Sequence, residues 1–281
     1  MKNYSIIIPH KNSPELLDRC LKSIPERNDI EIIVVDDCSD ENCRPQIDRK
    51  GVEIIYVTKE ETKGAGRARN LGLKKATGRW LLFADADDYY INNHINKLDE
   101  LKDSDYDIVF FDYDTNLRSG HTSFSTRLNQ MLNGGKRDRA NFKHMSNAPW
   151  NKMFKTEFVK KNKIQFDEIP AQNDAYFVHK ASYLTDNFYY INEKLYFYEI
   201  NSSGITRKKR KKEDIELAAA TQIKINKFKA KSGAWDCIMF GFNKKEFKEH
   251  GFFFTARLYL KKFRHGLIGY MIRKALYRKR R

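Results

Sequence analysis

The chain has 281 residues, 41% of them hydrophobic, which is enough for a substantial core in one large domain or two smaller ones. No apolar run approaches the roughly 20 residues that span a bilayer, and the run before Pro9 is too short for a signal peptide, so we expect a cytoplasmic protein. Four cysteines are too few for a disulfide scaffold, so we expect reduced thiols. The net charge of +16 belongs to the C-terminal part, because residues 207–281 hold 23 Lys and Arg against 6 Asp and Glu, whereas residues 1–206 hold 30 against 31.

Short apolar runs and helical spacing alternate over the first 84 residues. Strands are predicted at 5–8, 31–35 and 52–57 and in the run after Arg79. Helices are predicted from Pro14 to Ile24 and from Ala65 to Ala76. Because the strands are apolar without alternation, we expect a mostly parallel sheet covered by helices on both faces, as in α/β proteins.

The rest of the chain gives weaker signals. We expect, in order, a strand at 107–113, long loops or a flap at 114–143, a helix opened by 149–154, a helix start at 172–177, two aromatic strands within 187–200, a charged hinge at 207–212 and a helix at 213–228.

Acidic residues follow two of the predicted strands. Asp36 and Asp37 come after the second, and Asp85, Asp87 and Asp88 after the fourth. In parallel sheets ligands bind beyond the carboxyl ends of the strands, so these acids are expected to share a site. Alternate positions of an extended chain point the same way, which would let two of the later acids bind Mg²⁺ or Mn²⁺. Alternatively, the acids only begin a helix over 91–101.

The segment 63–72 is rich in glycine and arginine and lies between the third and fourth strands. It is not a dinucleotide fingerprint, because Arg69 stands where that motif needs glycine and the strand before it is the third, not the first. Glycines that open an arginine-bearing helix can direct N–H groups and positive charge to a diphosphate. The alternative is an amphipathic helix whose arginines face water.

Seven motifs in a fixed order resemble glycosyltransferase family 2, the inverting enzymes of the GT-A fold. They cover roughly residues 4–206 and read IIIPHKN near the start, VVDDCSD at 34–40, GAGRARNLG at 64–72, LLFADADD at 81–88, PWNKMF at 149–154, NDAYF at 173–177 and YFYEINSSGIT at 196–206. The resemblance implies a GT-A domain over 1–206, with a nucleotide-sugar half (1–100) and an acceptor half (101–206), followed by a basic, mainly helical extension (207–281).

The resemblance also implies roles for single residues. It places Asp85 and Asp87 on a metal ion, Mn²⁺ or Mg²⁺, and makes Asp174 the catalytic base. Asp37 would hydrogen-bond the nucleotide base, usually uracil. The remaining donor-site residues would be Pro9, Asp36, Gly66, Arg69, Asn70, Asp85 and Ala86, and those on the acceptor side Asp88, Trp150, Asn151, Lys152 and Asn173.

One departure from the family pattern concerns the base. Most members carry a Glu-Asp pair there, whereas this chain has Asn173-Asp174. The substitution keeps the base and removes the neighbouring charge. His10, Lys11 and Asn12 also differ from the residues that are frequent after the first strand.

The resemblance implies a metal-dependent inverting transferase that moves a sugar from a nucleoside diphosphate sugar, with UDP the expected nucleotide, to a glycan or lipid-linked acceptor in surface polysaccharide or lipooligosaccharide synthesis. The cation would neutralise the leaving diphosphate, and a separate carboxylate would take the acceptor proton. One alternative is a sugar-phosphate nucleotidyltransferase, which would need a Gly-rich loop after the first strand, where this chain has Pro9-His10-Lys11-Asn12. Another is a non-catalytic nucleotide-sugar or membrane-binding module of the same fold.

The basic C-terminal extension admits three interpretations. Over 252–281, apolar residues recur on one helical stripe: Phe252, Ala256, Tyr259, Leu260, Phe263, Leu267, Tyr270 and Met271. The stripe either packs on the catalytic domain or lies on an anionic membrane at the inner face of the cell membrane. Nucleic-acid binding has only the charge in its favour, so no nucleic-acid partner is expected.

Overall fold

A computed structural model describes residues 2–91, 93–116, 147–170, 172–200, 211–231 and 250–261. The chain divides into two compact units, Met1–Gly204 and Ile205–Arg281. In these described segments no helix is both long and apolar enough to cross a membrane. Four predicted features lie wholly or mostly outside them: the flap at 114–143, the end of the motif at 196–206, the hinge at 207–212 and the second half of 252–281.

The first unit alternates strands and helices, as the apolar runs predicted. Its elements are β1 (Tyr4–His10), α1 (Pro14–Lys22), β2 (Ile30–Asp36), the 3-10 helix η1 (Glu41–Cys43), β3 (Val52–Tyr56), α2 (Ala65–Lys75), β4 (Trp80–Phe83), β5 (Tyr89–Tyr90), α3 (His94–Asp99), β6 (Ile108–Thr115), β7 (Lys152–Lys155), α6 (Thr156–Lys161), α7 (Ala175–Leu184) and β8 (Phe188–Tyr198).

These strands form one sheet in the order β3-β2-β1-β4-β7-β6-β8-β5. The first four are mutually parallel, β6 and β8 are parallel, and β7 and β5 run antiparallel to their neighbours. The expected mostly parallel α/β sheet is therefore confirmed. Since β1, β2 and β4 are adjacent and parallel, the residues that follow them meet at one edge of the sheet.

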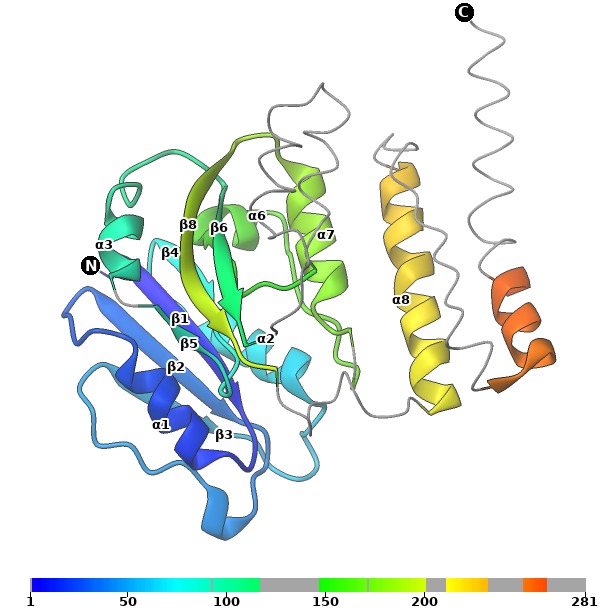
Figure 1. Ribbon diagram of the computed structural model, residues 1–281, viewed down its shortest axis with the longest axis horizontal. Helices are drawn as coiled ribbons and strands as arrows, with labels where there is room; N and C mark the ends of the chain where they lie inside the picture. Colours follow the sequence, from blue (N-terminus) through cyan, green and yellow to red (C-terminus); the bar gives the residue numbers. More distant parts are fainter. Residues whose placement is uncertain are drawn as a thin grey trace, which may run out of the picture. The chain divides into compact units, whose positions relative to one another are not determined.

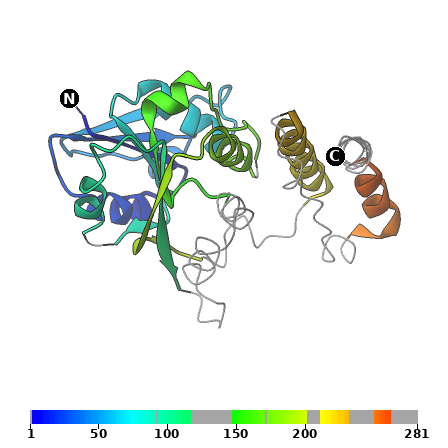
Figure 2. The same cartoon turned by 90° about the horizontal axis from the view of Figure 1, so that it is seen from above.

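Helices cover both faces of the sheet, which explains the absence of alternation in its strands. Ile6 and Ile8 of β1 pack in a core cluster with residues of α1 and α3, whereas Ile7 packs in a second cluster with residues of α2, α6 and α7. Figure 1 and the view from above in Figure 2 show α1 and α3 on one side of the sheet and the other three helices on the opposite side. Every β1 side chain except the partly exposed Pro9 is thus buried, whichever face it occupies.

Two predictions about the second half of this unit are wrong. Residues 149–154 do not open a helix, because Lys152–Lys155 form strand β7, which is inserted antiparallel between β4 and β6. The helix α6 begins only after it. The two aromatic strands expected in 187–200 are one strand, β8, whose register with β6 is irregular around Phe111 and Asp112.

The second unit contains α8 (Lys212–Lys231) and a helix at 252–261. Leu258 packs with Ile215 and Ala219 of α8 in a small apolar cluster, which Phe254 borders. The predicted stripe is not the buried side of the described part of this helix. Its buried side contains Thr255 and Leu258, whereas Phe252 and Leu260, which the stripe included, are exposed.

Candidate active site

Asp36 lies at the end of β2, directly opposite His10 in the parallel register. Its buried carboxylate accepts a hydrogen bond from His10 Nδ1 at 2.8 Å and from the Ser39 hydroxyl at 2.5 Å. The Ser13 N–H donates to His10 Nε2 at 3.2 Å, which leaves the imidazole proton on Nδ1. Asp36 is therefore held by protein groups, and it shapes the loop after β2.

Asp37 is the acid of this pair that remains available. Its Oδ2 accepts the N–H of Gly64, just before α2, at 3.1 Å and lies 3.9 Å from Lys11 Nζ. Its Oδ1 is buried, and no partner for it exists among the described residues. A buried carboxylate oxygen without a partner is costly, so this oxygen suits a ligand N–H group.

Helix α2 brings Arg69 to the centre of the site. The guanidinium is buried, forms an ion pair with Asp85 and donates to the side-chain oxygen of Asn173 at 2.9 Å. It also lies 5.5 Å from the centre of the Phe166 ring. The alternative interpretation, in which the arginines of this helix face water, is wrong for Arg69. This residue links the loop after β4 to the chain that enters α7.

The start of α2 is packed closely against the chain around 166–173. A Cβ on Gly66 would lie 2.0 Å from the carbonyl oxygen of Asp167, so only glycine fits there. Asn70 bonds both backbone groups of Phe166, accepting its N–H at 2.9 Å and donating to its carbonyl at 3.0 Å. Gly66 and Asn70 thus fix the position from which Arg69 reaches its two partners.

Asp88 is completely buried below this surface. Tyr196 donates to one carboxylate oxygen at 2.8 Å and the Glu199 N–H to the other at 2.8 Å. The Tyr196 oxygen also accepts the N–H of Asp85 at 3.0 Å. Burial and the nearby Asp85 charge raise the pKa of Asp88 to about 9. This residue therefore orders the acidic loop, and its place on the acceptor side stays a prediction.

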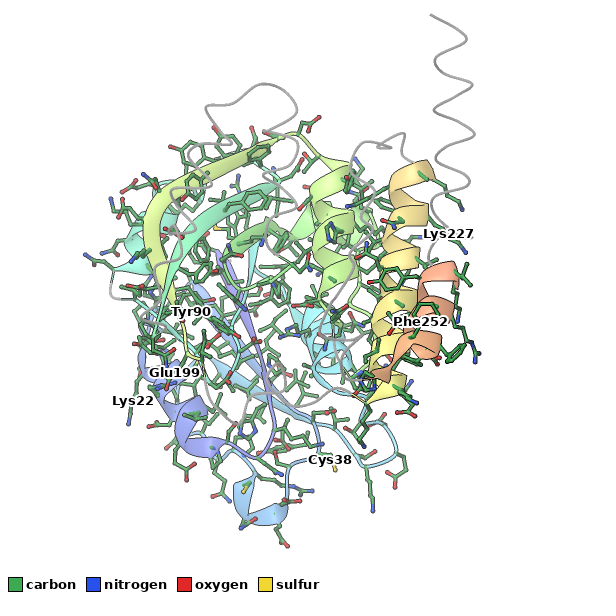
Figure 3. The ribbon with its side chains drawn as sticks, turned by 45° about the vertical axis from the view of Figure 1, so that its right-hand side comes forward. Lys22, Cys38, Tyr90, Glu199, Lys227 and Phe252 are labelled. Atoms are coloured by element: carbon green, nitrogen blue, oxygen red, sulfur yellow. The ribbon has the colours of Figure 1, made fainter. Side chains whose placement is uncertain are left out.

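Asp85 and Asp87 are partly exposed, whereas Ala86 between them is packed in the core. The chain here is a turn closed by the Asp88 N–H on the Asp85 carbonyl at 3.0 Å, so the expectation of an extended chain is wrong. Arg19 of α1 bonds the Asp87 carbonyl and pairs with Glu199. Tyr90 and Glu199, which flank this loop, are labelled in Figure 3.

The fit to a metal ion depends on this loop. Within the described segments no group of three or more His, Cys, Asp or Glu side chains is placed to hold a metal. Two partly exposed carboxylates suit Mg²⁺ or Mn²⁺, which take oxygen ligands and can complete their shell with waters and substrate phosphates. The residues present therefore fit a cation that arrives with a diphosphate.

Asp174 directly precedes α7. Its side chain makes no capping hydrogen bond, although its backbone carbonyl accepts the Val178 N–H at 3.0 Å. It is therefore not a simple helix cap. Burial raises the pKa of this carboxyl above its usual range, and the charges of Arg69 and Lys152 oppose the rise. A carboxylate with a raised pKa is better suited to accept a proton.

The residues of 150–152 support the site from inside the sheet. Trp150 stacks on Tyr196 and Tyr198 with ring centres 4.9 and 5.2 Å away. Lys152 donates to the side-chain oxygen of Asn151 at 2.6 Å, and burial lowers the pKa of this lysine to about 7. All three residues of 150–152 are buried, which suits a supporting role, and their contact with an acceptor stays a prediction.

Sequence reasoning missed Arg19, Tyr196 and Glu199. The latter two stand in the motif at 196–206, which marks the region without giving their contacts. Arg19 had no signal, because a basic residue near the end of a helix is common on any surface. Pro9 lies in β1 opposite Val35, as expected for the strand that leads into the site.

Comparison with known proteins identifies the family of the chain. The sequence profile described as Glycosyl transferase family 2 matches residues 5–162. The poly(ribitol-phosphate) beta-N-acetylglucosaminyltransferase TarS of Staphylococcus aureus is 27% identical over 224 residues, which cover 73% of this chain and 36% of TarS. The glycosyltransferase GlyG of Streptococcus pneumoniae is 27% identical, with 72% of each chain covered. The chain thus spans about a third of the length of TarS.

Solved structures give the fold. The crystal structure of S. aureus TarS 1–349 with UDP-GlcNAc matches this chain with a TM-score of 0.65 at 22% identity. The match covers 80% of this chain and 66% of the TarS chain. The mannosyltransferase PcManGT of Pyrobaculum calidifontis, solved with GDP-Man and Mn²⁺, has a TM-score of 0.54 at 14% identity, with 95% and 73% covered. This protein has the GT-A fold, and it belongs to glycosyl transferase family 2.

Proposed function

We propose that the protein transfers a sugar from UDP to a hydroxyl group of a glycan or lipid-linked acceptor, with inversion at the anomeric carbon. The observation that carries this proposal is the position of Arg69, which contacts Asp85 on one side and Asn173, the neighbour of Asp174, on the other. The buried Arg69 guanidinium thus connects two parts of the site. Asp85 is suited to a metal ion and a diphosphate, and Asn173 stands beside Asp174, whose carboxylate is suited to proton transfer.

The donor nucleotide would bind along the edge formed by the ends of β1 and β2. Asp37 Oδ1, buried and without a partner in the described part of the chain, is an acceptor for the N–H of a uracil base. The S. aureus TarS structures with UDP-GlcNAc and with UDP support this choice of nucleotide. Pro9 and Gly66 would line the same pocket.

Asp85 and Asp87 would hold the metal, Mn²⁺ or Mg²⁺. When bound, the ion supplies positive charge to the diphosphate as the anomeric bond breaks. Arg69 contributes a second, permanent positive charge at this point, and Arg19 and Tyr196 keep the acidic loop in place. The presence of Mn²⁺ in the PcManGT structure supports the assignment.

Asp174 would act as the base. The acceptor hydroxyl gives its proton to the Asp174 carboxylate while its oxygen forms a bond to C1 of the sugar. The bond between C1 and the diphosphate breaks in the same step, so a single displacement inverts the anomeric centre. The proton ends on Asp174 and the negative charge on the diphosphate.

The acceptor and location are proposed on wider grounds. The name of TarS includes poly(ribitol-phosphate). WfaP of Escherichia coli is 34% identical over 116 residues, which cover 40% of this chain and 45% of WfaP, and its name includes a diphosphoundecaprenol-linked sugar. A surface polysaccharide or lipooligosaccharide made on a lipid carrier fits both. The GT-A domain of 1–206 would then work at the inner face of the cell membrane, with the basic residues of 207–281 facing anionic lipid.

Thermal unfolding of the full chain with UDP, GDP, dTDP and CDP, each with and without Mn²⁺, tests the donor and metal assignments. A nucleotide that binds only the native state at about 100 times its Kd adds about 2.7 kcal/mol and raises Tm by several degrees. We expect UDP with Mn²⁺ to give the largest shift. The same shift without metal would contradict the metal site.

Two variants make the assay specific. Asp87→Ala is expected to lose the part of the shift that needs Mn²⁺, and Asp37→Ala the preference for UDP over CDP. If no nucleotide raises Tm in the wild type, the binding site is absent. If UDP binds but no acceptor is glycosylated, the non-catalytic module, favoured only by Asn173, becomes the better interpretation.

A further inference from the structure

The helix at 252–261 has one side that is already occupied. Leu258 and Thr255 are buried, and Leu258 packs against Ile215 and Ala219 of α8. Lys212 of α8 lies over the Phe254 ring, with Nζ 5.5 Å from its centre. The inner side of the helix therefore has its packing partner within its own unit. Figure 3 labels Phe252 on this helix and Lys227 on α8.

The opposite side of the same helix is apolar as well, and it is exposed. Phe253 is 88% exposed, Leu260 68% and Phe252 63%. Phe253 and Leu260 are seven residues apart, two turns along one face, and the exposed cations Arg257 and Lys261 lie close to that face. Single exposed apolar residues are ordinary, but three large ones on one short helix indicate an interaction surface.

The charge of the surrounding sequence selects the kind of partner. Residues 207–281 contain 23 basic and 6 acidic residues, whereas residues 1–206 are nearly neutral. A second copy of the same face would bring like charges together, which disfavours self-association through it. A nucleic acid would pair with the cations but leave the two phenylalanines in water. An anionic lipid surface accommodates both, because apolar side chains enter the acyl boundary while basic ones stay at the headgroups.

We propose that the outward face of this helix, formed by Phe252, Phe253, Arg257, Leu260 and Lys261, docks in the plane of an anionic membrane. The inference extends the proposed membrane location by assigning the contact to one face, and it leaves the chemistry of the sugar transfer untouched. The inner face stays on α8, so docking needs no rearrangement of the two helices.

Binding of the full chain to phosphatidylcholine vesicles with and without phosphatidylglycerol tests the proposal. Phe253→Ser with Leu260→Ser is expected to reduce partitioning onto the anionic vesicles by about tenfold or more, because both side chains lose their burial in lipid. Both are exposed, so the variant should keep the wild-type Tm. The matched control, Leu184→Ser with Tyr189→Ser, removes exposed apolar residues of the first unit and should bind normally.

Two charge-reversal variants distinguish the effect of the docking face on vesicle binding from the effect of net charge. Arg257→Glu with Lys261→Glu and Lys224→Glu with Lys227→Glu change the net charge equally, and all four residues are exposed. The first pair should weaken binding more than the second. Equal loss in both, or wild-type binding by Phe253→Ser with Leu260→Ser, would overturn the assignment.

Three further results would also refute it. They are equal wild-type binding to vesicles without phosphatidylglycerol, a wild-type dimer that the serine variant converts to monomer, and binding to nucleic acid in place of vesicles. Loss of the UDP-dependent Tm shift is a separate result, since it would refute the proposed donor site and leave the docking face untouched.

Discussion

Arg69 has two different acceptors in the site, a carboxylate on Asp85 and an amide oxygen on Asn173. A guanidinium can bond both because its N–H groups diverge in one plane, which a lysine ammonium cannot reproduce in the same fixed geometry. With an acid at 173, which the resemblance to the family implies for most members, Arg69 would be shared between two negative charges. Asparagine at this position would leave more of the positive charge of Arg69 to Asp85, Asp174 and the diphosphate of the proposed donor.

The variant Asp174→Asn tests the base directly. The amide keeps the size of the side chain and cannot accept the proton, so kcat should fall by about 10² to 10⁴ while donor affinity stays within a few-fold of wild type. Transfer kinetics and the UDP-dependent Tm shift measure the two quantities. Glu157→Gln, which neutralises an exposed carboxylate on α6, is the control and should leave kcat unchanged.

The pH profiles of kcat/KM for wild type and Asp174→Asn give a second test of the proposed base. An ordinary aspartate has a pKa of about 3.9. Because burial raises the pKa of Asp174 above this value, its carboxyl takes up a proton at a higher pH. Below that raised pKa the Asp174 carboxyl is already protonated and cannot accept the acceptor proton, so kcat/KM should fall as the pH falls through it. The asparagine variant should lack this acidic limb. A wild-type kcat in Asp174→Asn, or an identical limb in both proteins, would remove Asp174 from the base role.

Contacts between elements hold the acidic loop. Tyr196 of β8 is fully buried, and its single oxygen serves Asp85 and Asp88 at once. Tyr196→Phe would leave the Asp85 N–H and the buried Asp88 carboxyl group each short of a partner, which should cost about 1–3 kcal/mol and reduce the Mn²⁺-dependent Tm shift. Urea unfolding measures the first effect. Tyr189→Phe, on an exposed residue of the same strand, is the control, and equal stability of the two variants would contradict the prediction.

Glu31 at the start of β2 plays a comparable part at the other end of the sheet. Its carboxylate accepts bonds from Ser5 at 2.5 Å, from the Thr77 N–H at 2.6 Å and from the Gly78 N–H at 3.0 Å. It therefore joins β1 and β2 to the turn between α2 and β4. Burial alone would raise the pKa of Glu31, but these hydrogen bonds lower it, so the stabilisation exists at neutral pH and is lost as the carboxyl is protonated in acid.

The expected result for Glu31→Gln is a loss of about 1–3 kcal/mol in the free energy of unfolding, because the donors lose a charged acceptor. Urea unfolding at neutral pH measures it. Glu53→Gln, which breaks an exposed pair with Lys75, should cost less than about 1 kcal/mol. The prediction fails if both variants lose the same amount.

The elements that local sequence could predict are those whose pattern is set within one segment. Ile6–Ile8 and Ile32–Val35 form apolar runs, and Asp85 and Asp87 follow such a run. β7 could not be predicted this way, since Pro149 and the lysines of 152 and 155 resemble a helix start, and only pairing with β4 and β6 makes the segment a strand. The partners Arg19 and Tyr196 depend on the same long-range packing.

At the level of the complete chain, the nearly neutral first unit and the basic second unit would separate the proposed chemistry from the proposed membrane attachment. Residues 1–206 carry 30 basic and 31 acidic residues, so the positive charge at the site comes from specific side chains such as Arg69 and not from a general surplus. The excess of 207–281 is available for a surface partner. Global stability, in turn, should respond to pH mainly through buried groups of the first unit.

His94 of α3 is the clearest such group. It is buried, its ring stacks on Tyr90 with centres 4.4 Å apart, and its Nδ1 lies 3.1 Å from the Ile91 carbonyl oxygen. Burial lowers the pKa of this histidine to about 4. In the unfolded chain the pKa is about 6.5, so between these values the unfolded state binds a proton that the folded state does not. The free energy of unfolding should therefore fall as pH decreases, by about 3 kcal/mol in total from this residue.

Urea unfolding of wild type and His94→Phe between about pH 7 and pH 5 measures this contribution. Phenylalanine keeps a ring against Tyr90 and cannot titrate, so the variant should lose stability less steeply as pH falls, by up to about 2 kcal/mol over this interval. The difference between the two slopes isolates His94 from carboxylates that titrate in both proteins. Parallel slopes would mean that the histidine is solvated or already protonated in the folded protein, and the buried neutral imidazole would have to be abandoned.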